Sequence, residues 1–423
     1  MSREMKSTEL EWLGDIPNDW ETIPNKHLMK KKKELCPKFN GEDILSLSMR
    51  GVYVRDPNDE SGKRPATYDG YQYVNEGDLL MCLFDIDVTP RCVGRVYDNG
   101  LTSPAYSRMV MNPKRANVDY YYYYYLALDF DKTLLHLSKN MRSSLTEVDF
   151  GGIKAPVPPV SEQRQIVSFL DRKCSAIDTA IEKIKKSIEK LEEYKKAVIT
   201  KAVTKGLDPD AKMKDSGVEW IGEVPETWDV KQLRKFYSRR LNKNKNLQEQ
   251  NLLSLSYGNI IRKNIDTKEG LLPESFDGYN IVEANDIVIR GTDLQNDHKS
   301  LRTGLVTERG IITSAYMTLK PKAGVNSEYY HYLLHCYDIE KVFYSMGGGL
   351  RQSLDYWDFI RTYVLVPSEQ EQRNIVEFIN NKCGSIDALI AKKQETVGKW
   401  EEYKKSLIYY AVTGKIDCRN EVI

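Results

Sequence analysis

The sequence predicts an α+β chain in which two similar globular domains are separated by two long helices that pair as an antiparallel coiled coil. Three observations support this prediction. The second half of the 423-residue chain repeats the first half at an offset of 208 to 210 residues. Each repeat begins with short apolar runs broken by Gly, Pro, Asn and Asp, a pattern typical of strands and turns. Each repeat ends in a heptad stripe of apolar residues, which is typical of a long helix.

The duplication extends over nearly the whole chain. Repeats of this length are too long to be units of a solenoid, so each one is a domain-sized copy. The clearest matching segments are residues 12–20 with 220–228, 45–48 with 253–256, 103–106 with 313–316, and 192–196 with 401–405. The predicted boundaries are domains at 1–160 and 207–367, long helices at 161–206 and 368–415, and a C-terminal tail at 416–423.

The first part of each copy predicts strands and turns with one helix among them. Apolar runs of strand length lie at residues 44–47, 78–84 and 92–96 of the first copy. One helix is predicted to interrupt the strands at residues 119–137. Pro158 and Pro159 end this part of the copy, because proline is not tolerated in the interior of a helix.

The heptad stripes predict two helices of about 44 residues, each about 66 Å long at a rise of 1.5 Å per residue. A helix with one apolar stripe needs a partner, and we expect the helix of the other copy to bury it. Antiparallel pairing relates the two copies by a pseudo-twofold axis. Lys195, Lys393 and Lys404 are polar intrusions that leave the register open. The predicted seam consists of Leu170, Ile177, Ile181, Ile184, Ile188, Leu191, Val198, Ile379, Ile386, Ile390, Val397, Trp400 and Leu407.

Charge and cysteine content argue against several classes of protein. Lys and Arg number 62 against 61 Asp and Glu, and no stretch has the apolar length of a membrane span or a signal peptide. The seven cysteines form no CxxC pair, which argues against a disulfide framework and a zinc ribbon. We therefore expect a cytoplasmic protein without a metal site. The nearly neutral net charge is compatible with nucleic-acid binding, because acidic residues elsewhere on the surface can balance a basic face.

Motif searches identify no catalytic residue. The sequence has no GxxxxGK[ST] phosphate loop, no GxGxxG, and no Asn/Asp-Pro-Pro-Tyr methyltransferase motif. His331 and His335 are four residues apart, but no third metal ligand accompanies them. Residues 193–195 have the ExK spacing of a nuclease without its upstream acidic partner. The tyrosine run at 120–125 and its counterpart at 329–332 are expected to pack in helices.

The two copies diverge at two places within their shared frame. One is the segment after Leu-Ser-Leu-Ser, and the other is the loop after the shared Asp-aliphatic-aliphatic, which is two residues longer in the second copy. These segments are rich in Arg, Asn, Gln, Asp and Ser, which pair with base edges in the DNA grooves. Drifting surface loops are the alternative explanation. The candidates for base readout are Arg50, Tyr53, Arg91, Tyr257, Asn259, Arg290, Gln295 and Asn296.

Basic residues near these segments suggest contacts to DNA phosphates that do not depend on sequence. A solvated basic face is the alternative. The candidates for phosphate contacts are Lys31, Lys32, Arg55, Lys63, Arg64, Arg239, Arg240, Arg262, Lys263 and Lys299.

In these paired motifs the chain resembles the specificity subunits of type I DNA restriction-modification enzymes. The resemblance covers nearly the whole chain and depends on three elements. These are the tandem Trp-Leu-Gly-x-Ile-Pro-x-x-Trp openings, the block at residues 102–106 with its partner, and the twin Pro-x-x-Glu-Gln-Arg-x-Ile-Val helix starts. It implies two target recognition domains, each with a twisted, mainly antiparallel sheet and helices. Each domain would read one half of an asymmetric bipartite DNA site, and the helices would set the spacing.

The resemblance also implies partners. Double-stranded DNA would be bound by this chain, and two modification subunits carrying S-adenosylmethionine would dock on its helices and methylate adenine. Restriction subunits would use ATP and Mg²⁺ for motor and nuclease activity. The chain itself would be non-catalytic and hold no cofactor. Two other functions stay open from the sequence: a nuclease or other DNA enzyme whose active site the motifs do not reveal, and a structural scaffold without a DNA role.

Overall fold

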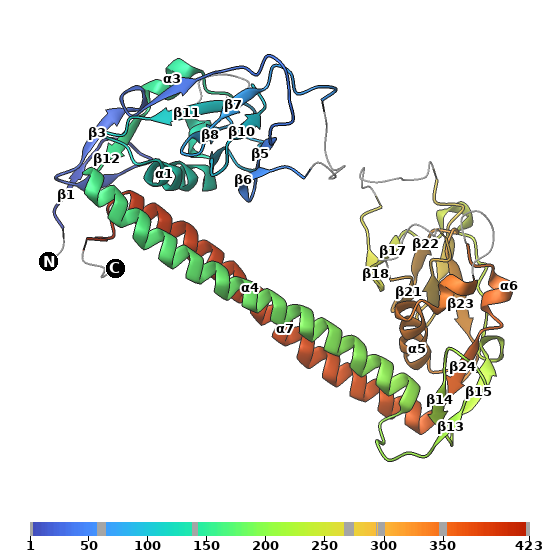
Figure 1. The fold of residues 1–423 in the computed structure, drawn as a ribbon. Coiled ribbons are helices and arrows are strands. Elements are labelled where there is room, and N and C mark those ends of the chain that lie inside the picture. Colours follow the sequence, from blue (N-terminus) through green and yellow to red (C-terminus); the bar gives the residue numbers. More distant parts are fainter. Residues whose placement is uncertain are drawn as a thin grey trace. The chain divides into compact units, whose positions relative to one another are not determined.

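The computed structural model describes residues 3–56, 65–137, 143–265, 275–292, 294, 301–346 and 353–419. The chain forms two compact units, and each unit contains one globular domain together with part of both long helices (Figure 1). Unit 1 comprises Met1–Lys185 and Gln394–Ile423, and unit 2 comprises Lys186–Lys393. The division differs from the predicted boundaries because each helix packs against a globular domain near both of its ends.

Unit 1 is built around a four-stranded antiparallel sheet in the order β4-β11-β8-β9. Three strand pairs surround it, namely β3 with β12, β5 with β6, and β7 with β10, and a further pair, β1 with β2, lies near the N-terminus. The bounds are β1 Met5–Ser7, β2 Asp15–Pro17, β3 Glu21–Pro24, η1 Asn25–His27, β4 Met29–Lys32, β5 Leu45–Ser48, β6 Gly51–Val54, β7 Gln72–Val74, β8 Leu79–Met81, β9 Val93–Arg95, β10 Gly100–Thr102, β11 Ser107–Met111, α1 Val118–Phe130, α2 Thr133–His136, α3 Glu147–Gly152, β12 Lys154–Val157 and α4 Val160–Lys205.

Unit 2 repeats this arrangement with the sheet order β16-β23-β20-β21. All of its strand pairs are antiparallel as well. The bounds are β13 Met213–Asp215, β14 Glu223–Pro225, β15 Asp229–Gln232, η2 Leu233–Lys235, β16 Tyr237–Arg239, η3 Lys245–Leu247, β17 Leu253–Ser256, β18 Asn259–Arg262, β19 Asn280–Val282, β20 Ile287–Ile289, β21 Thr303–Leu305, β22 Gly310–Ile312, β23 Met317–Pro321, α5 Ser327–Ile339, η4 Val342–Met346, α6 Tyr356–Phe359, β24 Tyr363–Val366 and α7 Glu369–Val412.

The inner strands β8 and β20 are buried on both faces, which explains why their sequences are continuous apolar runs. In β8, Leu79 and Met81 belong to the core beneath α1, whereas Leu80 belongs to a smaller cluster under the β5–β6 hairpin. In β20, Ile287 and Ile289 face α5 while Val288 faces the β17–β18 hairpin. A helix therefore covers one face of each sheet and a hairpin covers the other.

The single helix predicted at 119–137 is two helices. Helix α1 ends at Phe130, and Lys132 takes a left-handed conformation with φ of 51° before α2 begins. A left-handed residue cannot be part of a right-handed helix, so the chain turns there. The tyrosine run packs as predicted, because Tyr120, Tyr121, Tyr124 and Tyr125 are all buried.

Tyrosine hydroxyls tie each domain to the long helices. In unit 1, Tyr120 donates to the carbonyl of Val412 at 2.8 Å, and Tyr123 donates to the Asp171 carboxylate at 2.6 Å. The C-terminal residues also pack in unit 1: Cys418 is buried and Lys415 donates to the carbonyl of Leu13. The described part of the predicted tail, up to Arg419, is therefore an integral part of this unit.

The long helices α4 and α7 run antiparallel within each unit (Figure 1). The predicted seam residues Leu170, Ile177, Ile181, Ile379, Ile386, Ile390, Val397 and Leu407 are buried. The predicted seam residues Ile184, Ile188, Leu191 and Val198 are only half-buried. At the end of α4 the buried residue is Ile199, because the helix turns that side into the unit 2 core, and Val198 is half-buried. Trp400 remains 36% exposed. No helix in the described part of the chain is long and apolar enough to cross a membrane.

Candidate nucleic-acid interface

The β5–β6 and β17–β18 hairpins hold the first of the divergent segments. Each hairpin packs so closely on the neighbouring strand that the strand carries glycine at the contact. A Cβ at Gly94 would lie 2.6 Å from the Leu47 side chain, and a Cβ at Gly304 would lie 2.6 Å from the Leu255 side chain. The hairpin tips therefore have equivalent positions in the two units.

The tips themselves differ. In β5–β6 the turn residues are Met49 and Arg50, and both are exposed. In β17–β18 the turn residues Tyr257 and Gly258 have φ of 47° and 81°, as a two-residue type I′ turn requires. Tyr257 is 81% exposed. A tyrosine in a left-handed conformation costs energy, and its exposed ring recovers little of that cost by packing, so this turn displays the ring to solvent.

In unit 1 the two divergent segments meet. Arg50 from the hairpin and Arg91 from the loop after β8 line one cavity of about 540 Å³. Phe84 and Tyr106 also line it, with ring centroids 6.2 Å apart and planes at 22°. Guanidinium donors beside aromatic rings suit both the edges and the faces of nucleobases. Two residues predicted separately as base readers therefore lie at one site.

In unit 2 the described candidates lie on the hairpin and next to β20. Asn259 is exposed and its side chain donates to the carbonyl of Tyr257 at 3.3 Å, and Arg290 is half-buried at the end of β20. In unit 1, Tyr53 on β6 is 40% exposed. The remaining candidates for base readout, Gln295 and Asn296, lie outside the described residues.

The predicted phosphate contacts fall into two groups. Lys32 and Lys263 are exposed and Arg55 is half-buried. The others contact the protein surface: Lys31 lies 3.7 Å from Glu147, Arg239 lies over the Tyr356 ring, and Arg262 forms an ion pair with Glu308. Surface ion pairs such as those with Glu147 and Glu308 contribute little stability, so a DNA phosphate can replace the glutamate carboxylate. Lys63, Arg64 and Lys299 lie outside the described residues.

Arg240 corrects the prediction. Its guanidinium forms an ion pair with Asp286, which is completely buried at the start of β20, and Nη2 lies 3.0 Å from Oδ1. Burial raises the pKa of Asp286, and the bond to Arg240 opposes that rise. Arg240 therefore neutralises a carboxylate inside the fold and is not a surface phosphate contact. Arg108 was not among the predicted residues, and it does the same for Asp78 in unit 1, with Nε 2.6 Å from Oδ2. The signal was an arginine inside a buried strand, which requires an acidic partner.

The two histidines lie beneath the hairpin tip of unit 2. His331 and His335 have ring centroids 6.0 Å apart on α5, and a Cβ at Gly258 would lie 3.2 Å from the His335 ring. Burial lowers the pKa of both histidines to about 4, helped for His331 by the charge of His335 and for His335 by Lys195 and Lys196. Among the described residues no group of three or more His, Cys, Asp or Glu side chains could hold a metal ion.

The lysines in the helical seam form equivalent ion pairs in the two units. Lys195 bonds to both carboxylate oxygens of Asp387 at 2.7 Å in unit 2, and Lys404 bonds to Asp178 in unit 1. Each pair joins α4 to α7. The lysine of the ExK sequence therefore bonds to the facing helix.

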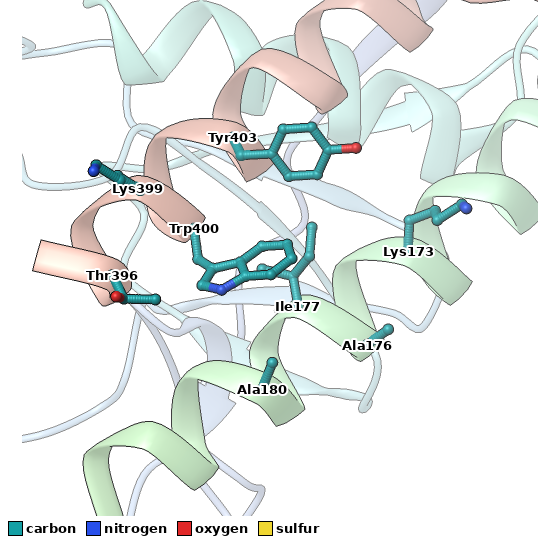
Figure 2. A pocket seen from close by; sticks show the side chains of 8 residues that line it. All are labelled: Lys173, Ala176, Ile177, Ala180, Thr396, Lys399, Trp400 and Tyr403. Carbon is teal, nitrogen blue, oxygen red and sulfur yellow. The ribbon is translucent and has the colours of Figure 1, made fainter. Parts of the chain in front are cut away.

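An open groove lies between the helices in unit 1, with a volume of about 650 Å³ (Figure 2). Trp400 and Tyr403 from α7 line one side, and Ala176, Ile177 and Ala180 from α4 line the other. The alanines leave room beside the indole, which explains why a predicted seam residue is partly exposed.

Comparisons with known proteins find a matching family model and two similar curated proteins. A family model described as the type I restriction modification DNA specificity domain matches residues 17–193. Two curated proteins of Methanocaldococcus jannaschii, the type I restriction enzyme MjaVIII specificity subunit and the putative type I restriction enzyme MjaX specificity subunit, are each 26% identical to the chain. The first match covers 96% of this chain and 95% of that protein, and the second covers 97% and 96%.

Two solved structures are similar in fold. One is a chain from a study of complex assembly and conformational transition of the type I R-M system, with a TM-score of 0.68, 13% identity, and coverage of 95% of this chain and 99% of that chain. The other is the HsdS subunit from Thermoanaerobacter tengcongensis, with a TM-score of 0.51, 13% identity, and coverage of 95% and 98%. These similarities confirm the predicted fold class. The family model matches the first repeat, the second repeat copies that repeat, and the relatives match from end to end, so the comparisons support the resemblance of this chain to type I restriction-modification specificity subunits.

Proposed function

We propose that the chain selects the DNA sequence on which a type I restriction-modification complex acts, and that its two units read the two halves of an asymmetric bipartite site. The observation that carries the proposal is that the two units share the same strands and helices but differ in the sequences of the hairpin tip and of the loop that follows the inner strand. In unit 1 the hairpin tip and the loop after β8 line one cavity, and in unit 2 the tip lies against Leu301, which precedes β21. One tip carries the exposed Arg50, whereas the other carries the exposed Tyr257. Equivalent hairpin tips that carry unlike side chains are expected to read unlike bases.

The experiment that tests the proposal is a methylome. The chain is expressed together with its modification subunit in a host without adenine methylation of its own, and methylated adenines are mapped across the genome. The expected result is one motif with two short specific parts separated by unspecified bases. A palindrome, or a single uninterrupted motif, would contradict the assignment of one half-site to each unit.

The helices are proposed as the docking site for two modification subunits and as the spacer between the half-sites. Of 44 aligned positions in residues 161–204 and 370–413, 22 are identical, and many of these are polar or charged. Because the two helices carry many of the same polar residues at equivalent positions, each helix can bind one copy of the same partner. S-adenosylmethionine would then be bound by the modification subunits, and ATP and Mg²⁺ by restriction subunits, while this chain acts without a cofactor.

A nuclease reading of the same chain has less support. Its one sequence signal was the ExK spacing at residues 193–195, and Lys195 is bound to Asp387 of the facing helix. The two readings are separated by incubating the purified chain with DNA and Mg²⁺ alone. Cleavage without partner subunits would favour the enzyme.

A further inference from the structure

Arg302 is a completely buried arginine just before β21 in unit 2. Its Nη1 donates to the carbonyl of Thr292 at 2.7 Å and lies 3.3 Å from the carbonyl of Arg290. Its backbone N–H donates to Asp338 on α5. A guanidinium is buried at acceptable cost only when it is well hydrogen-bonded. Here the main chain of the loop after β20 supplies two of the acceptors.

Unit 1 has a lysine in the same role, from a different place in the chain. Lys132, between α1 and α2, donates from Nζ to the carbonyl of Thr89 at 2.6 Å and to the Asp129 carboxylate at 2.8 Å. Thr89 belongs to the loop after β8. Asp129 also accepts the backbone N–H of Cys92, the residue at the position equivalent to Arg302.

The two units therefore reach one arrangement with different residues. Asp129 and Asp338 occupy equivalent positions and accept equivalent backbone N–H groups. The lysine equivalent to Lys132 is Lys341, whose Nζ lies 3.4 Å from the Tyr344 hydroxyl and 4.8 Å from the centre of its ring. In unit 2 Arg302 contacts the loop through the carbonyls of Arg290 and Thr292. The residue that bonds to the loop carbonyls therefore differs between the two units, but the bond between a cation and the loop main chain is present in both. We infer that this bond is important for the position of the loop.

We propose that Arg302 and Lys132 are positioning residues for DNA specificity, each holding the main chain of one reading loop from beneath. The proposal rests on the proposed function, because it takes the loops with Arg91 and Arg290 to be the reading segments. Carbonyl oxygens are present whatever side chains a loop carries. A buried cation that bonds to carbonyls can therefore hold a loop whose sequence has diverged.

The test uses the chain assembled with its modification subunit. Methylation is measured at the cognate motif and at motifs with one base changed in either half. Arg302→Met keeps the bulk and removes the donors. We expect it to reduce discrimination at least tenfold in the half-site read by unit 2 and to leave the other half unchanged. Lys132→Met should do the same for the other half-site, and Arg302→Lys should restore part of the lost discrimination.

Arg240→Met is the matched control, because it removes a half-buried cation of unit 2 that bonds to the buried Asp286 and not to the loop. A purely structural role for Arg302 predicts that both variants lower thermal stability and leave the discrimination ratio unchanged. That result would overturn the proposal. If the wild-type complex shows no bipartite motif at all, the proposed function fails independently of the positioning role.

Hydrogen exchange of the isolated subunit tests the positioning directly. In Arg302→Met the amides of residues 290–292 should exchange at least tenfold faster, while those of β16 and β23 stay within twofold of the wild type. Where Arg302→Met does not fold, Arg302→Gln is measured instead. Unchanged exchange at residues 290–292 in a folded variant would overturn the proposal.

Discussion

The two globular domains bury the same carboxylates but neutralise them from different strands. Asp78 and Asp286 occupy equivalent positions just before β8 and β20. Asp78 bonds to Arg108 on the inner strand β11, whereas Asp286 bonds to Arg240 just beyond the end of the edge strand β16. A buried carboxylate requires a hydrogen-bonded partner, but the partner can come from any strand within reach. Both copies of the fold therefore have an arginine beside the buried aspartate, but the arginine comes from a different position in each copy.

The largest expected effect on stability comes from removing the arginine that bonds to the buried aspartate. Arg240→Met should destabilise unit 2 by about 3 to 5 kcal/mol, because it leaves Asp286 buried without its partner. Lys32→Met, at the equivalent position in unit 1, should change stability by less than about 0.5 kcal/mol. Hydrogen exchange resolved by unit measures both effects. Equal losses in the two variants would refute the assignment of the partners.

A second difference is a dependence on pH that only unit 2 should show. His331 and His335 have a folded pKa of about 4 against about 6.5 unfolded, and the equivalent positions in unit 1 are Tyr122 and Leu126. Between these pH values the unfolded chain binds more protons. The stability contribution of each histidine is therefore complete above pH 6.5 and falls by on the order of 3 kcal/mol per histidine as the pH drops toward 4.

Unit-resolved hydrogen exchange at pH 7 and pH 5 checks this expectation, since unit 1 acts as an internal reference. The double variant His331→Leu with His335→Gln should remove most of the pH dependence of unit 2. An undiminished dependence in that variant would assign the effect to other groups, such as the buried Asp286.

The predicted base readers should give a smaller effect that is specific to one half-site. Arg91→Ala should relax one half of the motif and Arg290→Ala the other, each at a cost of about 1 to 3 kcal/mol in binding free energy. Lys32→Ala should weaken all sequences about equally, because a phosphate contact carries no base information. Binding to cognate and mutated sites at several salt concentrations measures both effects. Uniform loss in the arginine variants would make them phosphate contacts.

The ion pairs of the helical seam should give the smallest effect. Lys195→Met and Lys404→Met each remove an exposed pair, so each should cost about 0.2 to 1 kcal/mol, decreasing as salt is raised. Because Asp387 and Asp178 are equivalent partners, the two losses should agree within about 0.5 kcal/mol. Urea unfolding at low and high salt measures them, and a clear inequality would show that the two helical segments pack differently.

Parts of the fold followed from local patterns. Helices α4 and α7 begin and end within three residues of their predicted bounds, because heptad spacing and the flanking prolines are local signals. The break at Lys132 was missed because a left-handed residue inside a helical composition leaves no clear mark. The loops with Arg50 and Arg91 were identified from divergence between the copies, but their meeting in one cavity could not be read from the sequence. The predicted DNA contacts stay predictions.

The sequence by itself determined the duplication, the two long helices, the strand-rich domains and the family resemblance, since each depends on residue order and period. Only the tertiary structure decided which cations serve the interior. Arg240 looked like a surface contact in a basic run, and Arg302 was not among the predicted residues. Their roles depend on Asp286 and on loop carbonyls that are distant in the chain. Whether a side chain is buried depends on the residues that pack around it. A charged side chain that loses its contact with water in this way must form hydrogen bonds within the protein.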